Sequence, residues 1–208
     1  MANVASPFGL VQWGTVNGAT PNFASMNNPP FRIAYNAGAI YYGDLVSLVS
    51  GSTPTGYITQ WANGDGSATY QAAGVFFGCR YLSVSQRKVV WNNFWPGSDV
   101  ASGQDVEAYV CADPNAIFMI QAYSGPINQS MVGMTCDVEV GSGNTTTGWS
   151  AMSLENPSTS NPSYLPFKII GPVTAPPGVN GTDVTTAYNN VLVSFNNQIF
   201  KSLLTIHS

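Results

Sequence analysis

The sequence predicts an all-β protein, built either as a sandwich or as a barrel. Three observations support this fold class. From residue 39 onward, short apolar or alternating segments recur at spacings of about 8–15 residues. Clusters of Gly, Pro and Asn separate these segments. A sustained helical period of about 3.6 residues is absent outside a possible turn or two near 182–188 and near the C-terminus.

The expected strands follow in chain order. Segment 39–51 alternates and then meets a turn at Gly51 and Ser52, and segment 56–66 ends in a turn of Gly, Asn and Asp. Segments 73–84 and 87–95 form a hairpin across a polar turn at Ser85 and Gln86. The remaining expected strands lie within 105–113, 116–123, 132–141, 166–173 and 190–204.

The N-terminal segment, residues 1–38, differs from the rest in pattern. Its apolar side chains are scattered among Asn, Pro, Gly and Ala, and prolines stand at positions 7, 21, 29 and 30. These prolines exclude a long helix and disfavour a central strand. We therefore expect an extended N-terminal arm that packs either on the all-β body, residues 39–208, or on a neighbouring subunit.

Two long polar loops, 141–163 and 175–190, interrupt the body. The first contains Trp149, Met152 and Leu154 among its polar residues. Loops longer than about 12–15 residues are usually either functional or disordered. Both loops are therefore candidate contact surfaces.

The charge balance narrows the classes of partner. Only 8% of the residues are charged, against a usual share of about 25%, and the net charge is −4. Nucleic-acid binding requires a basic surplus, and an acidic surface is repelled by anionic membranes, so we expect neither partner. A low charge reduces the desolvation cost of burying surface, which favours an assembly protein. A neutral secreted β-domain has the same composition.

The cysteines and the histidine give little sign of a cofactor. Cys79, Cys111 and Cys136 are an odd set without a CxxC spacing, so we expect buried free thiols formed in a reducing compartment. The single histidine, His207, lies in the tail. We expect no metal or other cofactor, and the first ten residues do not resemble a signal peptide.

Paired carboxylates leave one catalytic reading open, because a glycosidase needs only two. Asp105 with Glu107, and Asp137 with Glu139, each share one face of an expected strand. The solvent face of a half-buried strand explains both pairs, with the alternate valines and alanine facing inward, and we favour it. The glycine-rich segment 141–148 lacks the GK[ST] of a phosphate-binding loop. We therefore expect a protein that is not an enzyme.

Basic and aromatic residues interleave in FFGCRYLSVSQRKVVWNNFWPG, residues 76–97. The stretch holds Arg80, Arg87 and Lys88, half of the six basic residues, beside Trp91 and other aromatics. A base-stacking surface has this composition, but the chain carries ten acidic residues against six basic ones. We favour a structural hairpin in which the aromatics pack across the strands.

Several landmarks, read in order, resemble a known family. They are ANVASPFGL, YYGDLVSLVSG, AGVFFGCRYLS, WPG, DPNAIFMIQ, VGSGNTTTGWSAMSLE, PFKIIGPV and NNVLVSFNNQIF. In this order they resemble the capsid decoration, or cement, proteins of tailed bacteriophages, over nearly the whole chain. The weight lies on the order and on the A-x-PFGL start, since no single motif is chemically specific.

The resemblance implies a β-barrel or β-tulip-like domain that binds the outside of a phage capsid and stabilises the shell. Its expected partners are the phage major capsid protein and further copies of itself, with a trimer favoured over a dimer. Its expected location is the virion exterior, after synthesis in the host cytoplasm. Long insert-like loops and the richness in Asn and Gly depart from the family pattern.

The residues expected to touch the capsid or a neighbouring subunit are apolar ones in the arm and the first long loop: Phe8, Leu10, Trp13, Phe23 and Trp149. Packing within the chain is the alternative for each of them. The alternative function is a carbohydrate-binding β-sandwich on the virion surface, in which exposed Trp and Tyr stack on sugar rings.

Overall fold

The computed structural model describes residues 3–16, 18, 31–49, 56–62, 71–160, 162–174 and 183–201. Within them the all-β class is confirmed. The strands, in order, are β1 (Val11–Thr15), β2 (Phe31–Ile33), β3 (Leu45–Leu48), β4 (Ile58–Gln60), β5 (Ala72–Ser83), β6 (Lys88–Asn92), β7 (Val106–Cys111), β8 (Ala116–Gln121), β9 (Thr135–Cys136), β10 (Val138–Glu139), β11 (Ser153–Leu154), β12 (Phe167–Pro172) and β13 (Asn190–Phe195). A single 3₁₀ turn is described, η2 (Gln129–Met131).

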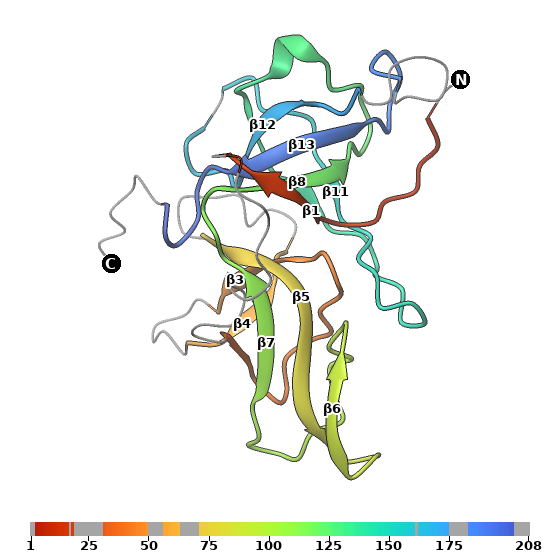
Figure 1. Cartoon of the computed structure of the whole chain (residues 1–208), viewed down its shortest axis with the longest axis vertical. Helices are drawn as coiled ribbons and strands as arrows, with labels where there is room; N and C mark the ends of the chain where they lie inside the picture. Colours follow the sequence, from red (N-terminus) through yellow and green to blue (C-terminus); the bar gives the residue numbers. More distant parts are fainter. Residues whose placement is uncertain are drawn as a thin grey trace.

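Among the described residues, two larger antiparallel sheets lie one above the other along the long axis (Figure 1). The upper sheet has the strand order β1-β8-β13-β12-β9. The lower sheet has the order β2-β7-β5-β3-β4, and β6 pairs with the far half of β5. Strands β10 and β11 form a separate ribbon. The long strand β5 is the central strand of the lower sheet, because three other strands pair with it.

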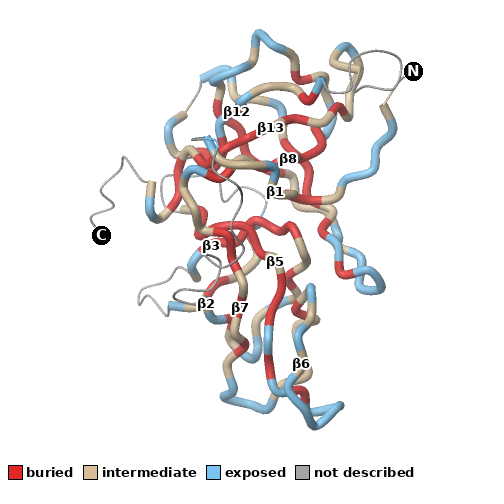
Figure 2. Tube along the Cα trace, in the orientation of Figure 1, coloured by how far each residue is buried: buried red, intermediate tan, exposed pale blue. Residues whose placement is uncertain are grey.

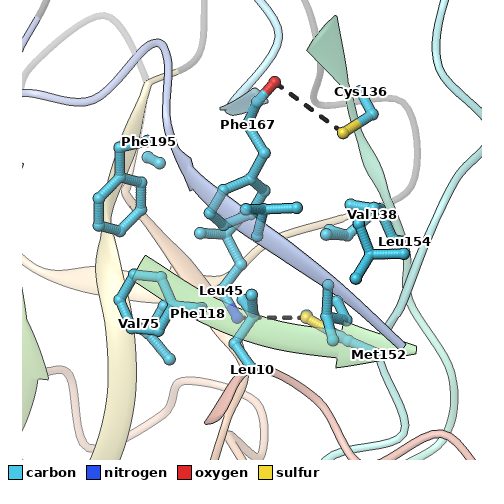
Figure 3. Close-up of a cluster of buried hydrophobic side chains, with 14 of the residues drawn as sticks. Leu10, Leu45, Val75, Phe118, Cys136, Val138, Met152, Leu154, Phe167 and Phe195 are labelled. Carbon is cyan, nitrogen blue, oxygen red and sulfur yellow. Dashed lines mark hydrogen bonds between the residues drawn. The ribbon is translucent and has the colours of Figure 1, made fainter. Parts of the chain in front are cut away.

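The first hydrophobic core joins the two sheets. Phe195 packs against Phe118 and Phe167, with ring centroids 5.3 Å and 5.4 Å away. Leu45 and Val75 of the lower sheet belong to the same buried cluster (Figure 3). Upper and lower strands therefore share one core.

The second core lies on the opposite face of the lower sheet. Phe76 and Trp95 are fully buried there, and Trp95 packs edge-on against Tyr81 at 5.2 Å. Neighbouring residues of one strand enter different cores: Val75 the first, Phe76 the second. This double burial explains why the start of β5 is an unbroken apolar run, since a strand covered on both faces has no polar side.

Beyond Gly78 the burial of β5 becomes one-sided. Tyr81 and Ser83 are buried, whereas Arg80 and Leu82 are exposed. Figure 2 shows the change along β5, from buried beside the upper sheet to alternating near the hairpin. The end of β5 beyond Arg80 thus projects with β6 as a two-stranded extension that has one open face.

The described part of the N-terminal segment packs on the all-β body, the first of the two possibilities expected for it. β1 pairs with β8 at the edge of the upper sheet, and β2 pairs with β7 at the edge of the lower sheet. The prolines restrict only their own neighbourhoods and leave room for short strands, which are edge strands as proline-rich sequence favours.

The two long loops are partly structural. Within 141–163, Met152 is fully buried and Ser153–Leu154 forms β11, so this half of the loop belongs to the first core. In 175–190, residues 175–182 lie outside the described part, and Asn189 is fully buried.

The three cysteines are buried and free, as expected. Burial raises the pKa of Cys79 to about 12 and that of Cys111 to about 11, so both are held as thiols. Among the described residues, no helix has the length and apolar character needed to cross a membrane.

Candidate interaction surface

The open face of the β5–β6 hairpin is apolar, although a solvated sheet face is normally polar. Leu82 and Val84 are each 56% exposed, Val89 is 49% exposed and Trp91 is 66% exposed. We call these four residues the hairpin face. Single exposed apolar residues are common, but a contiguous group of them marks an interaction site more often than chance.

The register of the hairpin brings Leu82, Val89 and Trp91 together, and Val84 lies in the turn that follows β5. Leu82 stands directly opposite Val89, and Arg80 stands opposite Trp91. Alternation along each strand then places Leu82 beside Arg80 and Val89 beside Trp91 on the same face. These side chains pack against one another across the two strands, and the side of the block that faces away from the sheet is open.

Arg80 is held in place at the edge of the hairpin face. Its guanidinium lies over the Trp91 ring, 5.9 Å from the centroid. Its Nε and Nη2 donate to Glu107 Oε2 of β7 at 3.0 Å and 2.5 Å. The cation therefore orients the indole while a carboxylate balances its charge.

The turn that closes the hairpin is fixed by Asp99. Its carboxylate accepts from Ser83 Oγ at 2.6 Å and from the Ser85 amide at 2.8 Å. These hydrogen bonds, first that of Ser83, lower the pKa of Asp99 below its usual value. Arg87 has a φ of 54°, a left-handed conformation that closes the turn. The hairpin face is thus presented on a braced element.

β6 is also an edge strand. Among the described strands it pairs with β5 alone, so its second edge carries no described strand. Exposed edges are sites of strand addition by a partner chain, and charged residues limit unspecific pairing there. Lys88 begins β6, directly after Arg87. The edge and the hairpin face together form a surface suited to a protein partner.

Trp91 and Phe94 correct the expected aromatic packing of the hairpin. Trp91 faces Arg80 across the strands rather than another aromatic ring. Phe94 instead stacks on Tyr41, with centroids 5.8 Å apart and planes 2° from parallel. The predicted hairpin is confirmed, whereas Trp91 and Phe94 do not pack against other aromatics across its two strands.

The four expected contact residues of the arm differ in where the structure places them. Leu10 is fully buried in the first core, which corrects its assignment as a contact residue. Phe8 is half-buried and precedes the tightly packed Gly9. Trp13 is 52% exposed on the edge strand β1, at an irregularity in its pairing with β8. Phe23 lies outside the described residues.

Trp149 is the contact candidate of the first long loop. It is 43% exposed, and its ring lies 4.8 Å from that of Tyr42. Tyr42 in turn packs edge-on against Phe77 at 5.0 Å. The loop is anchored by the Tyr42 amide, which donates to Gly148 O at 2.9 Å. Trp149 is therefore partly packed on the body and partly open to solvent.

The carboxylate pairs are engaged in structural contacts. Asp105 accepts from Tyr57 Oη at 2.8 Å and lies 3.7 Å from Arg32, while Glu107 binds Arg80. The residues between and beside them, Val106 and Ala108, are fully buried, as the solvent-face reading predicts.

Asp137 departs from the expected solvent face. It is buried, and its Oδ1 accepts from Trp61 Nε1 at 3.0 Å. Consecutive burial of Cys136, Asp137 and Val138 breaks the alternation between β9 and β10. In the part of the chain that the structure describes, no cluster of three or more His, Cys, Asp or Glu is suited to hold a metal ion.

The chain matches no protein-family model, and neither the curated proteins nor the solved structures contain a significant match to it.

Proposed function

We propose that this protein is a structural virion component that binds the outside of a bacteriophage capsid and stabilises the shell. The observation that carries the proposal is the hairpin face, an exposed apolar block on a braced edge hairpin. Interface centres are depleted in charge and enriched in aromatic residues, and this face has that composition.

The distribution of tryptophan supports an interaction role. Of the five tryptophans, Trp61 and Trp95 are buried in the body. Trp13, Trp91 and Trp149 keep 52%, 66% and 43% of their surface exposed. Tryptophan is the residue most enriched among those that dominate binding energy. Three exposed indoles on a chain that is only 8% charged favour large apolar contacts.

Shell stabilisation by binding requires no catalysed reaction. A ligand that binds an assembled shell, and not its separated subunits, shifts the equilibrium toward assembly by mass action. The buried free thiols fit synthesis in a reducing cytoplasm before attachment to the virion. The partners that we propose are the major capsid protein and further copies of this chain, with a trimer favoured over a dimer.

The test is co-sedimentation with undecorated capsids of the phage that carries the gene, together with light scattering of the protein alone. Wild-type protein should bind the shells with saturable, fixed stoichiometry. Replacing both Leu82 and Trp91 with threonine, which preserves strand propensity, should weaken binding at least tenfold, or by about 1.4 kcal/mol.

The matched control is Phe200→Thr, which removes another exposed aromatic, 64% exposed, outside the hairpin. It should bind as wild type does, and thermal unfolding should verify that both variants are folded. Wild-type protein that ignores intact shells would refute the proposed function. Shell binding that survives the double substitution would keep the function and reject the hairpin face as its site.

A further inference from the structure

A cavity of about 500 Å³ shares no lining residue with the hairpin. Segments from across the chain converge on it: the N-terminal stretch at Ala5 and Pro7, the end of β8 with Tyr123, β10 with Glu139, β11 with Ser153, and Tyr188. The volume lies within the usual range for small-ligand sites. Such convergence of distant segments is typical of a binding site.

The wall formed by the N-terminal stretch is fixed by side-chain hydrogen bonds. Gln121 accepts from the Ser6 amide at 2.7 Å and donates to Val4 O at 3.0 Å. The side-chain Nδ2 of Asn3 donates to Asp183 O at 2.8 Å and to Ala187 O at 3.1 Å. The N-terminal stretch is thereby tied both to β8 and to the turn that leads to Tyr188.

The position of Tyr188 is fixed by its neighbour Asn189. This residue is fully buried; its side chain accepts from the Ile127 amide at 3.0 Å and donates to Ile127 O at 2.7 Å. The adjacent Tyr188 has a φ of 62°, a left-handed conformation that is rare for a bulky side chain. Strained residues of this kind concentrate at ligand sites, where the surrounding structure holds them.

The lining combines aromatic rings with a carboxylate and a hydroxyl. Tyr123 is 49% exposed, and its amide donates to Leu154 O at 2.8 Å, which fixes it to β11. Glu139 stands opposite Ser153 in the β10–β11 ribbon. Aromatic faces bind the C–H faces of sugar rings, while carboxylate and hydroxyl groups bind their hydroxyls. The cavity offers both kinds of group.

The charge around the cavity selects among sugars. Glu139 neighbours two further acids, Asp137 and Glu155. Burial raises the pKa of Glu155, and the charges of Asp137 and Glu139 raise it further. The local potential is therefore negative, and it disfavours sialic and uronic acids.

We propose that this cavity is a saccharide site that takes a neutral or amino sugar of one or two rings, bound through Tyr123, Tyr188 and Glu139. This function is separate from shell binding, because the site shares no residue with the hairpin face. On a virion surface it would give the particle affinity for glycans.

The experiment is a glycan array of neutral, amino and acidic mono- to tetrasaccharides, probed with the full chain, followed by calorimetric titration of the best binder. Saturable binding of a neutral or amino sugar below about 10 mM is expected. Tyr123→Ala and Glu139→Gln should each weaken it at least tenfold. Tyr35→Ala, which removes a tyrosine 40% exposed at another cavity, should leave affinity unchanged.

Three results would overturn the proposal: no saturable binding on the array, a preference for acidic sugars, or affinity that both cavity substitutions leave intact. Thermal unfolding of each variant separates loss of binding from loss of fold. Shell co-sedimentation of Tyr123→Ala should equal that of wild type, so that the two functions are judged independently.

Discussion

Replacing Gly9 with alanine is expected to lower the free energy of unfolding by roughly 2–5 kcal/mol. Gly9 has a φ of +75°, and a Cβ there would lie 2.5 Å from Ser150 Cβ and 2.7 Å from Gly43 O. The amide of Gly9 donates to Met152 O at 3.1 Å, and that of Leu10 donates to Gly43 O at 2.8 Å. The chain is therefore held closely and cannot easily move aside.

Gly18→Ala is the matched control for this prediction. Gly18 has nearly the same φ, +74°, but no described atom lies within 4 Å of the position of its Cβ. Gly18→Ala should lower the free energy of unfolding by roughly 1–2 kcal/mol, the cost of placing a side chain in the left-handed conformation. Urea unfolding of both variants measures the difference. Equal losses would show that the contact of Gly9 with Gly43 and Ser150 contributes nothing.

Replacing Asp44 with asparagine is expected to stabilise the protein at pH 7 and to flatten its pH dependence. Asp44 is fully buried, and its Oδ2 accepts from the Tyr41 amide at 2.8 Å and from Gln60 Nε2 at 2.7 Å. Burial raises the pKa of Asp44 to about 6, from 3.8, while hydrogen bonds from Ser150, Tyr41 and Gln60 limit the rise.

The sign follows from proton linkage. Between pH 4 and 6 the folded state binds more protons at Asp44 than the unfolded state does, so stability falls as the pH rises through this window. The full cost at pH 7 is on the order of 3 kcal/mol. Asparagine keeps an acceptor and carries no charge, so the variant should recover a substantial part of this cost.

Urea unfolding of wild type and Asp44→Asn, from pH 4 to pH 7.5, provides the measurement. Glu155, whose pKa is also raised, contributes in the same direction, so the difference between the two curves isolates Asp44. Asp99→Asn gives the opposite sign: its pKa is lowered, so its removal should destabilise the protein at pH 7. A pH profile unchanged in Asp44→Asn would contradict the assignment.

The strands were predictable because their signal is local. The hairpin of β5 and β6 follows from two apolar runs around a polar turn, and Arg80 is exposed as alternation requires. The same alternation correctly placed Val106 and Ala108 inside. Alternation of apolar and polar residues identifies strands well, because the pattern lies within the residues of each strand.

The hairpin face was not predictable, because the sequence does not say which face of a strand another sheet covers. Leu82, Val89 and Trp91 have the composition of a core, and only the reach of β5 beyond the upper sheet leaves them open. The prediction that Asp137 faces solvent was wrong for a related reason, because its hydrogen-bond partner Trp61 is distant in sequence. Leu10 was assigned to an arm because its burial depends on strands that follow much later.

The sharing of β5 between two cores has a mechanical consequence. Val75 and Phe76, adjacent in the chain, anchor opposite layers, so a force that peels one sheet away must also disturb the other. Parting the sheets would open the first core to water, whereas the second core, on the far face of the lower sheet, would stay closed. We therefore expect mechanical loading to open the molecule first between its two sheets, with the lower sheet yielding later.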